Sequence, residues 1–69
     1  MTYDEKAMEK ILDCVEVFIP MTTNLIAKRA RKNYNEKISH STVERLLEEL
    51  KKKGEVRCYK SGKTLLWQR

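Results

Sequence analysis

The sequence predicts a small α+β domain in which three helices precede a C-terminal β-hairpin. Apolar residues recur at helical spacing in three segments, and Pro20 and Gly54 mark the ends of two of them. The last fifteen residues alternate around a turn that contains Gly62. With 69 residues, the chain is expected to form one domain, 1–69, with a thin core, because domains of this size bury only about 60% of their unfolded surface.

The first helix is predicted over residues 3–19. Its apolar residues follow helical spacing, and they are Met8, Ile11, Leu12, Val15 and Phe18. Thr2 followed by Glu5 has the pattern of a capping box. Pro20 is expected to end the helix, because proline lacks a backbone donor and disfavours helical geometry in the preceding residue.

The second helix is predicted over residues 23–33, with Thr22 or Thr23 as its cap. Its buried side is expected to comprise Leu25, Ile26 and Ala30, reaching Tyr34. Its exposed side carries four cations, which are Lys28, Arg29, Arg31 and Lys32. The Asn33–Asn35 region predicts a turn. Ile38 is expected to form a brief strand that anchors this turn to the core.

The third helix is predicted over residues 40–53, capped by Ser39 or Ser41. One apolar stripe predicts its buried face, and it consists of Val43, Leu46, Leu47 and Leu50. Gly54 follows three lysines and is typical of a C-terminal stop, with cations at the negative end of the helix dipole.

The hairpin is predicted over residues 55–68, with Ser61-Gly62 as a two-residue turn. This turn pairs Val56 with Trp67 and Cys58 with Leu65 on the core face. It places Arg57 opposite Leu66, and Tyr59 opposite Thr64, on the other face. Trp67 is therefore expected to lie in the core.

The net charge of +5 is unevenly distributed. Residues 1–20 carry two lysines against five acidic residues, residues 21–53 carry nine cations against four acidic residues, and residues 54–69 carry four against one. All of the positive excess thus follows Pro20. A polyanion would be attracted to that part of the chain and repelled by the first helix.

The two cysteines, Cys14 and Cys58, match no metal-ligand spacing. Buried free thiols are expected, with a disulfide as the alternative. A zinc site made from His40 and both cysteines would lack a fourth ligand, so no metal or cofactor is expected. No apolar run approaches the roughly 20 residues of a membrane span. The acidic N-terminal segment is unlike a secretory signal, and the sequence predicts a cytoplasmic protein.

The element order and the stretch ISHSTVERLLEELKKKGEVR resemble small winged-helix repressors of archaeal, bacterial or viral type. The resemblance implies a winged helix-turn-helix fold, with a short strand between the second and third helices and the hairpin as the wing. It also implies a transcriptional regulator that binds double-stranded DNA. Such repressors are commonly homodimers, and a dimer of this chain would use the outer side of the first helix or a patch such as Tyr59 and Leu66.

The spacing of the third helix predicts which of its residues face DNA. If Ser39 is the cap and Val43 points into the core, then His40, Ser41 and Arg45 point outward near the N-terminal end. Arg45 is expected to bind guanine through two hydrogen bonds, while His40 and Ser41 reach bases or phosphates.

Other residues are expected to support this contact. Thr42 is a candidate for a phosphate contact, and Glu44 for a hydrogen bond from cytosine. The wing is expected to follow the DNA backbone or minor groove through Arg57, Lys60 and Lys63. The four cations of the second helix would hold a phosphate strand. Glu44 and Glu48 flank this surface and would repel phosphates, whereas Glu48 and Glu49 are expected to pair with Arg45, Lys51, Lys52 or Lys53.

The stretch RLLEELKKKGEVR and the later LLW are similar to segments of Z-DNA-binding winged-helix domains, which also end with a wing Trp. Those domains read DNA with an Asn and a Tyr, where this sequence has Glu44 and Glu48. Their wing prolines are absent as well. This resemblance therefore implies the scaffold and not recognition of left-handed DNA.

Two other function classes are open at this stage. A winged-helix protein-interaction module of a replication or transcription assembly would use the acidic first helix and the glutamates of the third. RNA binding has weaker support, because the only aromatic side chains available for stacking are Tyr3, Tyr34 and Tyr59. No small-molecule substrate is evident. Catalysis is not expected, since consecutive helical residues such as His40 and Ser41 point about 100° apart and no orienting acid is evident.

Overall fold

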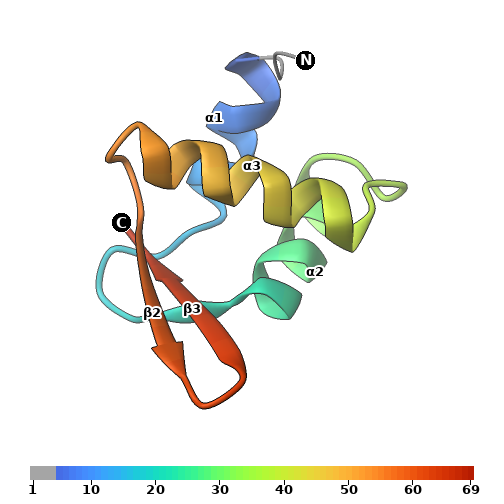
Figure 1. Ribbon diagram of the computed structural model, residues 1–69. Helices are drawn as coiled ribbons and strands as arrows, with labels where there is room; N and C mark the ends of the chain where they lie inside the picture. Colours follow the sequence, from blue (N-terminus) through green and yellow to red (C-terminus); the bar gives the residue numbers. More distant parts are fainter. Residues whose placement is uncertain (1–4) are drawn as a thin grey trace.

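The computed structural model describes residues 5–69 as three helices and a three-stranded antiparallel sheet. The elements in chain order are α1 (Glu5–Asp13), β1 (Met21–Thr22), α2 (Thr23–Asn33), α3 (His40–Lys52), β2 (Arg57–Ser61) and β3 (Thr64–Gln68). In the sheet, β3 lies between β1 and β2. Figure 1 shows α3 crossing the molecule between α1 and α2, with the β2–β3 hairpin extending away from the helices. This α+β arrangement is consistent with a winged-helix layout.

The core lies where α3 meets the other two helices and the inner face of the sheet. The stripe predicted for α3 is confirmed, because each of its four residues is at most 1% exposed. In α2, Ile26, Ala27 and Ala30 are fully buried, and the small alanines suit close helix packing. The expectation for Leu25 and Tyr34 was wrong, because both are exposed. Trp67, at 1% exposure, is a core residue as predicted.

The predicted helix caps of α2 and α3 are confirmed. Thr22 accepts a hydrogen bond from the backbone of Leu25, and Ser39 accepts one from the backbone of Thr42. At the end of α3, Gly54 has φ +78°, and the Glu55 amide donates to the Leu50 carbonyl at 3.0 Å. This left-handed glycine closes the helix in a way that other residues rarely adopt.

The first helix is shorter than predicted. It ends at Asp13, and the amides of Cys14 and Val15 then bond to carbonyls three residues back, which tightens the last turn. Phe18 is 89% exposed, so its expected place on the buried face was wrong, although Val15 enters the core from the loop. Because α1 ends at Asp13, residues 14–20 can carry the chain to β1, where Met21 pairs with Trp67. The expected capping box at Thr2 and the start at residue 3 lie outside the described residues.

The short strand lies before α2 and not at Ile38. Met21 pairs with Trp67, and Thr22 with Leu66, so β1 adds to the free edge of β3. Ile38 is buried and does anchor the turn, but its amide bonds to the Asn35 carbonyl and its own carbonyl accepts from Arg31. Because its backbone groups find partners outside the sheet, Ile38 needs no strand partner.

The hairpin register differs from the predicted one by two residues. Cys58 pairs with Trp67, and Ser61 with Thr64, which leaves Gly62 and Lys63 as the loop. Gly62 has φ +61° and Lys63 has no positive φ, as in a type II′ turn with Gly first. A shift of two residues preserves the side-chain alternation, so Cys58, Leu65 and Trp67 still share the core face.

Candidate nucleic-acid interface

The first turn of α3 is held by its cap and presents exposed polar side chains. The Ser39 hydroxyl accepts from the Thr42 amide at 3.1 Å and lies 2.8 Å from the Thr42 hydroxyl. Thr42 is half-buried and engaged in this cap, while His40 and Ser41 are exposed. Of these predicted contact residues, His40 and Ser41 are therefore the accessible pair at the helix start.

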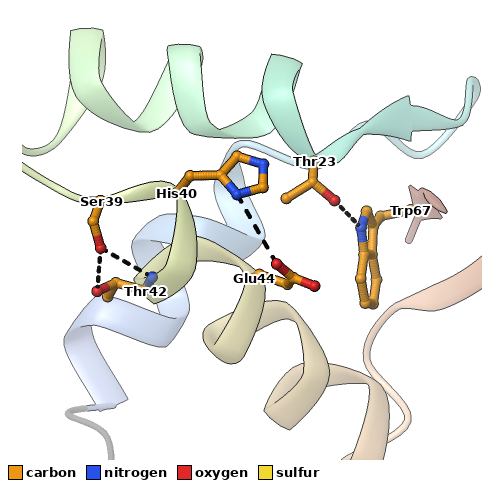
Figure 2. A network of polar contacts seen from close by, with 6 residues as sticks. All are labelled: Thr23, Ser39, His40, Thr42, Glu44 and Trp67. Carbon is orange, nitrogen blue, oxygen red and sulfur yellow. Dashed lines mark hydrogen bonds and ion pairs between the residues drawn. The ribbon is translucent and has the colours of Figure 1, made fainter. Parts of the chain in front are cut away.

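His40 and Glu44 lie one helical turn apart on the same side of α3. The Nδ1 atom of His40 is 3.9 Å from a carboxylate oxygen of Glu44, and both side chains are almost half exposed. Figure 2 shows the imidazole and the carboxylate facing each other. When His40 is protonated, it partly offsets the negative charge that Glu44 brings to this surface.

A groove of about 270 Å³ joins this turn of α3 to the wing. It is formed by the end of β1 and the start of α2, by the start of α3, and by the hairpin loop with the start of β3. Its lining residues are Thr22, Thr23, Asn24, His40, Glu44, Lys63, Thr64 and Leu65. The structure thus brings His40, Glu44 and Lys63, which the sequence analysis selected from separate segments, to a single groove.

A buried hydrogen bond fixes the position of the wing relative to α2. The indole N–H of Trp67 donates to the Thr23 hydroxyl at 2.8 Å, and Thr23 is 9% exposed (Figure 2). Trp67 belongs to β3, and β3 continues from the loop that carries Lys63. A buried indole N–H rarely lacks a partner. Here its bond connects the hairpin to the start of α2, and both of these segments line the groove.

The four cations of α2 divide into two pairs. Arg29 forms an ion pair with Glu16 at 2.6 Å, and the Nε of Arg31 donates to the Ile38 carbonyl at 3.1 Å. Both arginines are half-buried, and they connect α2 to the loops on either side of it. Lys28 and Lys32 are exposed, so of these four cations they are the more accessible to a phosphate group.

The cations of the wing lie at different distances from its tip. Lys60 and Lys63 are exposed beside or within the hairpin loop. Arg57 is at the opposite end of the hairpin, where its guanidinium donates to the Arg69 carbonyl at 3.1 Å. The sequence analysis treated these three as one wing surface, but only Lys63 lines the groove.

The remaining charged residues of α3 extend toward its C-terminal end. Arg45 and Glu48 are exposed, and neither lines the groove. Glu49 pairs with Lys52 at 3.5 Å, as helical spacing predicted. Both partners have substantial solvent exposure, so this pair contributes less than about 1 kcal/mol to stability.

The two cysteines are free thiols, as predicted. Cys14 is buried and Cys58 half-buried. Burial raises the pKa of the Cys14 thiol, the charge of Asp13 raises it further, and Arg29 opposes both effects. Among residues 5–69, no group of three or more His, Cys, Asp or Glu side chains is placed to hold a metal ion. In the same range, no helix is long and apolar enough to cross a bilayer.

Sequence reasoning missed the contribution of α2 to the groove. Thr22 and Thr23 were considered only as caps, and Asn24 was not considered. A signal for Thr23 was present, since a core tryptophan requires an acceptor for its indole N–H. Comparisons with protein-family models, with curated proteins and with solved structures found no match to this chain.

Proposed function

We propose that this protein binds duplex DNA through a winged-helix surface and acts as a transcriptional regulator. The start of α3 would enter the major groove, and the wing would contact the adjacent backbone or minor groove. The observation that carries the proposal is the groove, where His40, Glu44 and Lys63 come together from α3 and the wing. Occupation of a DNA site requires no catalysis or cofactor.

The charge distribution supports a polyanion as the ligand. The exposed cations Lys28, Lys32, Lys60 and Lys63 belong to the part of the chain with the positive excess. Contacts of this kind release condensed counterions from DNA and supply affinity without sequence information.

Sequence discrimination would come from the side chains at the start of α3. His40 and Ser41 are exposed there and can hydrogen-bond to base edges or phosphates. Glu44 repels phosphates but accepts a hydrogen bond from the cytosine amino group in the major groove. Arg45, exposed one residue further along, is the candidate for guanine.

The proposal is tested by fluorescence anisotropy on a labelled random duplex across a salt series. The parent is compared with the wing variant Lys60→Ala/Lys63→Ala and with the control Lys51→Ala/Lys53→Ala. The control removes the same charge from the exposed C-terminal end of α3. It therefore separates the effect of net charge from the effect of phosphate binding by the wing.

We expect parent binding at low salt to weaken steeply as salt rises. The wing variant should have a shallower log–log slope, by about 0.9 for each phosphate that its lysines no longer neutralise. The control should keep the slope of the parent. Equal slopes for both double variants, or no binding by the parent, would refute DNA binding by the groove and wing.

A further inference from the structure

Residues 17–19, here called the apolar loop, expose three large hydrophobic side chains in succession. Val17 is 49% exposed, Phe18 89% and Ile19 55%. They lie between α1 and β1, and none of the three lines the groove at α3 and the wing. Single exposed apolar residues are ordinary, but adjacent ones of this size are typical of a contact surface.

Hydrogen bonds to β3 and its extension fix the backbone of the apolar loop. The side-chain amide of Gln68 donates to the Val17 carbonyl at 2.7 Å, and the Arg69 amide donates to the Glu16 carbonyl at 3.1 Å. Glu16 is held in turn by its ion pair with Arg29. The loop therefore presents Phe18 from an ordered support, which lowers the entropy cost when a partner binds.

The apolar loop continues onto the outer face of the sheet. Leu66 pairs with Tyr59 on one side and with Thr22 on the other, and these three share the face opposite Trp67. Gln68 lies on the same face and reaches the loop through its bond to Val17. Tyr59 is 41% exposed, and Leu66 is half-buried. Figure 1 shows the loop beside the hairpin, near the C-terminal end of β3.

The charges around this surface are cationic. Arg57 lies on the outer face and is exposed, and its guanidinium donates to the backbone carbonyl of Arg69 where the sheet adjoins the loop. The nearby carboxylate of Glu16 is already paired with Arg29. Acidic groups on a partner would complement the charge of Arg57.

A second copy of this chain fits the surface poorly. Face-to-face contact centred on Arg57 would bring the guanidinium groups of both copies together, which is repulsive. A stable interface also takes about 800 Å² from each partner, about a sixth of the 5049 Å² that the whole chain exposes. The three loop side chains and one small sheet face suit a shorter binding segment.

We infer that the apolar loop and the outer sheet face bind a short segment of another protein that carries acidic and large apolar side chains. Phe18 would be the anchor that packs against the large apolar side chains of that segment. Arg57 would pair with its carboxylates. Thr22 borders both this site and the groove, but the site does not depend on the proposed DNA binding.

The test uses a phage-displayed library of random 12-residue peptides, selected on the immobilised protein. Selection on Phe18→Gln provides the reference, and Leu25→Gln is the matched control, because Leu25 is an exposed apolar residue on α2. Circular dichroism confirms that both variants fold. Affinities of the selected peptides are then measured by fluorescence polarisation, and sedimentation with vesicles of phosphatidylcholine and phosphatidylserine forms a separate arm.

We expect the parent to enrich peptides with Asp or Glu next to Leu, Phe or Trp. Phe18→Gln should weaken their binding by about tenfold or more, and Leu25→Gln by less than about twofold. Arg57→Ala should weaken the acidic peptides selectively. Absence of enrichment over Phe18→Gln, equal binding by that variant, or Phe18-dependent sedimentation with vesicles would overturn the proposal. If Phe18→Gln still binds duplex DNA, a negative result in the peptide test leaves the proposed DNA binding intact.

Discussion

The groove and the apolar loop expose different kinds of side chain to solvent. At the groove, the ends of charged side chains such as Lys63 and Glu44 are exposed. At the apolar loop, hydrogen bonds hold the backbone while Phe18 is almost fully exposed. Binding at the groove should thus be electrostatic and sensitive to salt, whereas binding at the loop should rely on apolar burial and change less with salt.

The groove and the apolar loop are two surfaces of one small scaffold. Both depend on β3, because Trp67 fixes the wing to α2 and Gln68 supports the loop. Substitutions in the shared support should damage both surfaces. Substitutions at either rim should affect only one of them.

The largest expected effect is that of Trp67→Ala, which removes the shared support. Loss of this buried side chain should lower the free energy of unfolding by about 3–5 kcal/mol, which is enough to unfold much of so small a domain. Trp67→Phe should cost less, since it keeps most of the packing but leaves the Thr23 hydroxyl without its donor. Urea unfolding followed by circular dichroism measures both. A Trp67→Ala protein as stable as the parent would contradict the role given to this residue.

Glu44→Gln is expected to separate affinity from specificity at the groove. Two unit charges about 4 Å apart interact by about 1 kcal/mol in water. Removal of the negative charge beside a phosphate should therefore strengthen binding to random duplex by up to about 1 kcal/mol. Preference for cytosine at the contacted position should weaken, because the acceptor is altered. Binding-site selection and anisotropy measure the two effects.

Glu55→Gln is the matched control for this prediction. Glu55 is exposed after the end of α3, so its substitution changes the net charge equally at a distance from the groove. Unchanged or weaker binding of Glu44→Gln to random duplex would contradict a phosphate close to Glu44.

Cys14 is expected to be the slower of the two thiols to react with Ellman's reagent at pH 8. It is buried and its pKa is raised, so little thiolate is present, whereas Cys58 is half-buried. The Cys58→Ser variant should therefore label slowly in the folded state and rapidly in denaturant. Equal rates for folded Cys14→Ser and Cys58→Ser would refute the assignment.

The raised pKa of Cys14 also predicts a pH dependence of stability. Above the ordinary value of 9.0, the unfolded chain loses a proton that the folded thiol keeps, so the free energy of unfolding falls as pH rises. This decline should be smaller in Cys14→Ala than in the parent. Identical pH profiles would show that Cys14 contributes nothing to it.

The smallest expected effect on stability is that of Phe18→Gln. Because Phe18 packs little against the rest of the chain, its replacement should change the free energy of unfolding by less than about 0.5 kcal/mol. Thermal melts of both proteins check this value. A loss of several kcal/mol would place Phe18 in the core, as its helical spacing had suggested.

Local signals predicted α2 and α3 well. Thr22 and Ser39 cap α2 and α3, as their side chains predicted. Gly54 has the positive φ that was expected after α3. The α3 stripe was also readable, since helical spacing places its four leucine and valine residues on one face.

Tertiary contacts explain most of the failures. Residues 14–20 have helical spacing, but Met21 gains a sheet partner in Trp67 only if the helix ends early. β1 itself is two residues long and has no pattern of its own. The hairpin register depended on whether Gly62 is the first or second residue of the turn, and composition alone permits both. The groove depended on how α2 and the wing meet, which spacing within each element does not determine.

A duplex titration followed by amide chemical shifts tests DNA binding at the groove. The ¹⁵N-labelled protein would be titrated with a random duplex at low salt, and shift changes mapped onto the sequence. We expect changes at His40, Ser41 and Lys63, with Val17, Phe18 and Ile19 unaffected. Changes confined to the apolar loop and outer sheet face, or none at saturating DNA, would contradict it.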